Sequence, residues 1–133
     1  MTIAPLTLDI GDQSGLVDAR EGLRAWLTEV GTESDVRDDI VLACWEATAN
    51  AVEHPLADPA EVAVQVRAVK QGDHVVVSVS DNGRWREREQ GHVREGRGLG
   101  LKLIRALMDR VQIVPSATGT EVLMCRRIAT RCR

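Results

Sequence analysis

Apolar and polar residues alternate from Val62 to Ser80, with one interruption at Lys70–Asp73. A period of two predicts β-strands with one buried face, and a short polar break containing glycine predicts a hairpin turn. The two strands are expected at 62–69 and 74–80. A hairpin with one apolar face is unstable alone, so other elements of the chain must cover that face.

Two helical patterns precede the hairpin. The first covers residues 14–30, has its apolar side chains on one face, and ends at Gly31. The second is expected over residues 32–54, with Thr32 as its N-cap and Pro55 as its stop. These helices can supply the missing cover.

The remaining segments complete a two-layer arrangement. A strand is expected at 4–10, a polar loop at 82–97, a helix at 99–109, and a closing hairpin of strands 111–114 and 120–127. The sequence therefore predicts one α+β domain over residues 1–133, with helices on one face of a mixed, mostly antiparallel sheet.

Composition excludes several classes of protein. A net charge of -3 argues against direct nucleic-acid binding. No apolar run approaches the roughly 20 residues of a membrane span, and no signal peptide is visible. The three cysteines, Cys44, Cys125 and Cys132, have no metal-ligand spacing, which favours a cytoplasmic protein. The arginines after residue 125 are expected to form a solvated basic tail.

Polar residues form a row on the second helix. Glu46, Asn50 and His54 are spaced four apart, beside an apolar stripe. The stripe consists of Val36, Ile40, Cys44, Ala47 and Ala51. A carboxylate at the edge of the core can act as a general base, and an amide oxygen one turn later can bind Mg²⁺. A solvated helix face is the alternative, and His54 before Pro55 fits a helix end.

Two further segments carry glycines where chemistry is expected. Asp81-Asn82-Gly83 follows a strand and is either a plain turn or an adenine-binding carboxylate with room beside it. Residues 96–100, Gly-Arg-Gly-Leu-Gly, lead into a helix, which is a geometry suited to phosphate. The absence of a following Gly-Lys-Ser/Thr excludes a Walker loop.

Together these motifs resemble the GHKL ATPase superfamily, or Bergerat fold, and within it the small anti-sigma-factor serine kinases. Residues 46–54 are similar to the family's N box, and Asp81-x-Gly83 and 96–100 to its two glycine boxes. Gly119-Thr120 resembles the family's Gly-Thr on the closing strand. The resemblance covers almost the whole chain.

The resemblance implies a role for each matching residue. Glu46 would be the catalytic general base on an incoming serine hydroxyl, and Asn50 would hold Mg²⁺ against ATP. The adenine would be bound by Asp81, Gly83 and Thr120. The phosphates would be contacted by Gly96, Arg97, Gly98, Leu99, Gly100 and Leu101. Residues 82–97 would form the ATP lid, in which Arg84-Trp85-Arg86 replaces a glycine and an apolar residue common in the family.

The resemblance also implies partners. A free-standing domain of this length is similar to the anti-sigma kinases, whose substrate is a serine on a STAS-type antagonist and whose other partner is a sigma factor. Two alternatives stay open, a nucleotide-sensing docking module without kinase activity and the ATPase domain of a larger phosphatase-linked regulator. Relatives also form homodimers through the first strand and helix, where Leu6, Leu8 and Trp26 are either interface or core.

Overall fold

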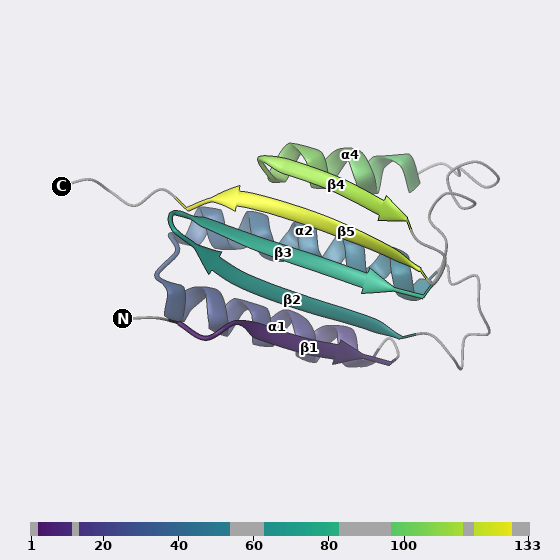
Figure 1. Cartoon of the computed structure of the whole chain (residues 1–133), viewed down its shortest axis with the longest axis horizontal. Coiled ribbons are helices and arrows are strands. Elements are labelled where there is room, and N and C mark those ends of the chain that lie inside the picture. Colours follow the sequence, from purple (N-terminus) through teal and green to yellow (C-terminus); the bar gives the residue numbers. More distant parts are fainter. Residues whose placement is uncertain (1–2, 12–13, 54–62, 83–96, 116–118, 129–133) are drawn as a thin grey trace.

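The computed structural model describes residues 3–11, 14–53, 63–82, 97–115 and 119–128. Two layers are visible in Figure 1, with the helices packed on one face of a single sheet. The elements, in chain order, are β1 (Leu6–Ile10), α1 (Ser14–Val30), α2 (Ser34–Glu53), β2 (Val64–Gln71), β3 (His74–Asp81), α4 (Arg97–Leu107), β4 (Arg110–Pro115) and β5 (Thr120–Arg127). The predicted α+β sandwich is confirmed.

The sheet has the strand order β1-β2-β3-β5-β4. All four neighbouring pairs of described strands are antiparallel, so the sheet is more uniform than the mixed one expected. In the turn from β2 to β3, Gln71 pairs with His74 and Gly72 has a φ of 60°. A two-residue hairpin turn favours such a positive φ, which glycine adopts at no steric cost.

Every second residue of a strand faces the helices. In β3 these residues are Val75, Val77, Val79 and, at the end of the strand, Asp81. Leu23 and Leu27 of α1 and Ile40 of α2 are fully buried in the helical layer that covers them. The core is therefore a layer of branched aliphatic side chains between sheet and helices, in a chain without Phe or Tyr.

The end of α1 corrects one prediction. Gly31, with a φ of 95°, follows the helix, and the amides of Gly31 and Thr32 bond back to carbonyls of Thr28 and Leu27. The hydroxyl of Thr32 also donates to the Leu27 carbonyl, so Thr32 closes α1 and is not the N-cap of α2. The first α2 bond instead runs from the Arg37 amide to the Glu33 carbonyl. Glu33 is thus the residue that opens the second helix.

Of the residues considered as a dimer surface, Trp26 belongs to the core, and Leu6 and Leu8 are half-buried against it. Trp26 is 6% exposed, and its indole N–H donates to the Ala4 carbonyl over 2.8 Å. Leu6 and Leu8 of β1 pack against the same core. These side chains stabilise the attachment of β1 to α1. None of the described helices is long and apolar enough to cross a membrane.

Candidate nucleotide site

Several elements meet at one end of the sandwich. In Figure 1 the C-terminal ends of α2 and β3 lie on the same side as the first residues of α4 and β5. Across the sheet at this end, Ile10 pairs with Val64, Val64 with Asp81, and Asp81 with Thr120. An apolar row thus becomes polar at its centre, at the edge of the helical layer.

Asp81 and Thr120 are the polar members of that row. Both are buried, with 9% and 3% of their surfaces exposed, and both occupy helix-facing positions of their strands. The residue before Thr120 is Gly119, where a Cβ atom would stand 1.9 Å from the Asp81 carbonyl oxygen. The two strands therefore approach each other at this point as only glycine permits.

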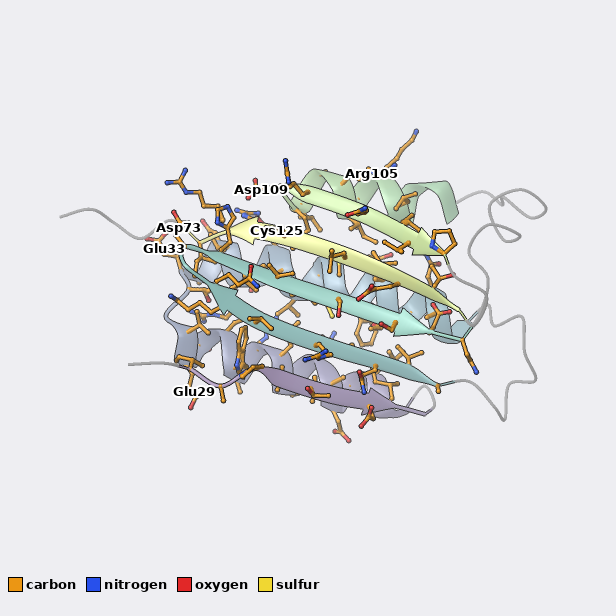
Figure 2. The ribbon with its side chains drawn as sticks, viewed as in Figure 1. Glu29, Glu33, Asp73, Arg105, Asp109 and Cys125 are labelled. Carbon is orange, nitrogen blue, oxygen red and sulfur yellow. The ribbon has the colours of Figure 1, made fainter. Side chains whose placement is uncertain are left out.

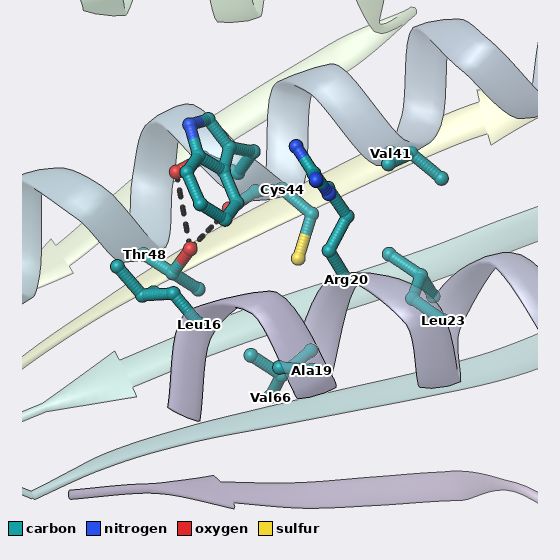
Figure 3. A pocket seen from close by; sticks show the side chains of 9 residues that line it. Leu16, Ala19, Arg20, Leu23, Val41, Cys44, Thr48 and Val66 are labelled. Atoms are coloured by element: carbon teal, nitrogen blue, oxygen red, sulfur yellow. Dashed lines mark hydrogen bonds between the residues drawn. The ribbon is translucent and has the colours of Figure 1, made fainter. Parts of the chain in front are cut away.

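The helix α2 presents different residues to its two neighbours. Val41, Cys44 and Thr48 face α1 and line a small cavity with it (Figure 3). On the other side, Asp39 binds Arg126, whose guanidinium also reaches the Leu107 carbonyl of α4. The α4-facing side of α2 therefore starts at Asp39.

Glu46 and Asn50 lie on this α4-facing side. Glu46 follows Asp39 by seven residues, close to two helical turns, and Asn50 follows Glu46 by four. Both side chains are half-buried, while Ala47 beside them is fully buried. The polar row predicted from the sequence thus lies along the crease between α2 and α4, with Asn50 nearest the Asp81 end.

The glycine-rich segment is described in part. Arg97, Gly98, Leu99 and Gly100 form the first turn of α4, and Leu101 follows them, half-buried. A helix that begins here directs unpaired amide N–H groups toward the same end of the molecule. The other predicted positions, His54, Gly83, Trp85, Gly96 and most of the lid, lie outside the described residues.

Two hollows differ greatly in size. The one in Figure 3, between α1 and α2, has a volume of about 10 Å³, which suits a single water molecule. An open hollow of about 480 Å³ lies at the ends of β1, β2 and β3, and Asp81 and Asn82 are among its walls. Small-molecule sites have volumes of this order. The described residues of its wall belong to these strands or stand directly beside their ends. Asp81 is the residue that this hollow shares with the candidate site.

The expected solvated basic tail is wrong for Arg126 but not for Arg127, whose side chain is 63% exposed. Both residues belong to β5, in line with the strand predicted over 120–127, and Arg126 bonds Asp39 over 2.8 Å and the Leu107 carbonyl over 2.6 Å. Arg127 pairs with Asp73, and its amide binds the Asp109 carboxylate, at the opposite end from the candidate site (Figure 2). A cation at the last carbonyls of α4 also favours the negative end of the helix dipole. Arg126 therefore links α4 to α2 about two helical turns before Glu46.

We expect Arg126→Met to lower the free energy of unfolding by about 1–3 kcal/mol. Methionine keeps the apolar stem but leaves the Asp39 carboxylate and the Leu107 carbonyl without their shared donor. Urea denaturation measures the loss. The matched control is Arg24→Met, because Arg24 pairs with Asp38 at side-chain exposures of 42% and 64%. That exposed pair should contribute less than about 1 kcal/mol. Equal losses in both variants would contradict a special role for Arg126.

Burial keeps Cys44 chemically inert. Desolvation raises the pKa of the Cys44 thiol to about 12, so the reactive thiolate is disfavoured at pH 8. We expect Cys44 to resist iodoacetamide at pH 8 in the folded protein and to react within minutes in urea. Mass spectrometry of tryptic peptides measures this. Rapid native labelling of Cys44 would show that α1 and α2 separate readily.

A family model described as a histidine kinase-like ATPase domain matches residues 12–126. The chain belongs to the histidine kinase-like ATPase family. The GHKL resemblance of the motifs is thereby confirmed, and domains of this family bind ATP.

Two solved structures are similar to this chain. The crystal structure of the RsbU and RsbW domains of Rv1364c from Mycobacterium tuberculosis is 32% identical, with a TM-score of 0.77. The match covers 98% of this chain and 34% of that one, so this histidine kinase-like ATPase domain spans about a third of its relative. The second structure is the Acinetobacter baumannii histidine kinase AdeS, which is 12% identical in sequence and has a TM-score of 0.53. The match covers 98% of this chain and 70% of AdeS, and it shows a shared fold alone.

Sequence reasoning missed Arg126 as a residue that positions the site. Its signal was present in the alternation of β5, where Val122 and Met124 face the helices. Arg126 has the same parity and must point the same way. A charged residue at an inward position predicts a partner of opposite charge, which here is the half-buried Asp39.

Proposed function

We propose that this ATPase domain is a protein-serine kinase that acts as an anti-sigma factor by partner switching. Its substrate would be a serine on a STAS-type antagonist, and its other partner a sigma factor. The observation that supports the proposal is that the C-terminal half of α2, which carries Glu46 and Asn50, ends on the same side of the sandwich as β3, whose last residue is Asp81, and the start of α4. The similarity to a structure containing an RsbW domain supports the kinase class.

The residues present fit Mg-ATP. A buried carboxylate beside a buried hydroxyl, Asp81 with Thr120, suits the amino group of adenine, which needs an acceptor away from water. The amide oxygen of Asn50 is a ligand type that Mg²⁺ accepts alongside water and phosphate oxygens. The helix N-terminus at Arg97 favours phosphate. Within the proposal, Gly83 and Gly96–Gly100 complete these contacts.

Each side chain has a defined task in this proposal. Asp81 and Thr120 would orient the nucleotide, and Asn50, one turn beyond Glu46 on α2, would hold the metal. The carboxylate of Glu46 accepts the proton of the serine hydroxyl as that oxygen attacks. Bound Mg-ATP would supply the γ-phosphoryl group and depart as ADP, while Mg²⁺ would offset the negative charge of the phosphates. Transfer of this kind depends mainly on positioning and electrostatics, which a rigid helix such as α2 provides.

Calorimetric titration with ATP and ADP, with and without Mg²⁺, tests the site. We expect magnesium-dependent binding to the wild type, and at least tenfold weaker binding to Asn50→Ala and Asp81→Ala. Radiolabel transfer to purified STAS-type proteins from the same genome then tests the reaction. Absence of nucleotide binding in the wild type would overturn the proposed kinase function. Binding without transfer would favour the nucleotide-sensing docking module.

A further inference from the structure

Large apolar side chains are exposed beside the candidate catalytic row. Leu42 of α2 is 40% exposed and Leu103 of α4 is 36% exposed, although each lies in the middle of a helix that packs on the core. Leu42 precedes Glu46 by four residues and therefore stands on its side of α2, one turn away. Single exposed leucines are common on protein surfaces, so these two indicate a binding surface only if they lie together beside Glu46.

The Arg126 bonds bring Leu42 and Leu103 to nearly the same level. Asp39 and the Leu107 carbonyl share one guanidinium nitrogen, so these two points of α2 and α4 lie at one height. The two helices run in opposite directions in Figure 1 and pack against each other. One turn toward the nucleotide end brings the chain to Leu42 on α2 and to Leu103 on α4.

We propose that Leu42 and Leu103 form an apolar step that docks the protein substrate. The inference rests on the proposed kinase and specifies what that kinase recognises: a folded protein with an exposed apolar side chain close to its acceptor serine. Continuity with Glu46 supports this occupant, because a substrate whose hydroxyl reaches Glu46 must cover the surface one turn away. Burying the two leucines would add affinity for the protein substrate.

The test measures KM and kcat for the STAS-type protein that the wild type phosphorylates fastest. We expect Leu42→Ser and Leu103→Ser each to raise KM roughly tenfold, the effect of losing one buried leucine. Both kcat and the Kd for ATP should stay within twofold. Val17→Ser is the matched control, because Val17 is 48% exposed on α1, and its KM should not change.

A second measurement identifies the partner group. Exposed apolar residues near the acceptor serine of the substrate are replaced by serine one at a time, and each variant is assayed against wild type and Leu42→Ser. One of these replacements should raise KM with the wild type but not with Leu42→Ser, because the contact is already lost. An unchanged KM in both leucine variants would overturn the proposal that Leu42 and Leu103 dock the substrate, while the proposed kinase activity would still stand. If the wild type binds the STAS-type protein without phosphorylating it, the Kd for that protein replaces KM as the measured quantity. The leucine variants should then raise this Kd roughly tenfold, and an unchanged Kd would overturn the docking proposal.

Discussion

Glu46→Gln should leave ATP binding unchanged and slow phosphoryl transfer by roughly 100- to 10 000-fold, the usual contribution of a positioned general base. Glutamine has the same shape and keeps the half-buried position on α2, so the fold and the Asn50 position are preserved. What it lacks is an acceptor for the serine proton. Single-turnover transfer to the antagonist, with Kd for ATP measured in parallel, separates the chemical step from binding.

The control for charge is Asp35→Asn, which removes one negative charge from the first turn of the same helix. Asp35 is exposed and lies three turns before Glu46. The rate of phosphoryl transfer by the Asp35→Asn variant should therefore stay within twofold of the wild-type rate. Equal slowing in both variants would point to a general electrostatic effect. A Glu46→Gln enzyme with the full transfer rate would remove Glu46 from the mechanism.

The fold was predictable wherever local patterns and tertiary packing agree. Helix α1 and strand β5 have the bounds predicted from periodicity, because their apolar faces are continuous and Gly31 stops the helix. One prediction failed where two local signals compete for the same residue. Thr32 is a good N-cap by residue type, but the carbonyls left open at the end of α1 bind it first.

The candidate site was predictable as a set of residue types but not as a geometry. The spacing of Glu46 and Asn50 places them on one side of α2, and only the packing of α4 shows which helix that side faces. The bond from Arg126 to Asp39 joins residues 87 positions apart, and no local pattern specifies such a pair. The exposure of Leu42 likewise depends on how far α4 extends over α2.

Gly119→Ala should destabilise the protein and weaken ATP binding at the same time. A Cβ at this position would lie 1.9 Å from the Asp81 carbonyl oxygen and 2.9 Å from its carbon. Both are backbone atoms, which cannot rotate aside as a side chain can, so β5 must move away from β3. We expect a loss of about 1–3 kcal/mol in urea denaturation, with larger losses if the strands separate further.

The same movement carries Thr120 away from Asp81, because these residues pair directly across the two strands. ATP affinity should therefore fall at least tenfold in calorimetry, beyond any effect of the lower stability. Gly11→Ala is the matched control at the end of β1, since nothing lies within 4 Å of a Cβ there. It should change stability by less than about 0.5 kcal/mol and leave ATP binding intact. If Gly119→Ala loses stability but binds ATP normally, the pairing of Asp81 with Thr120 serves the sheet and not the nucleotide.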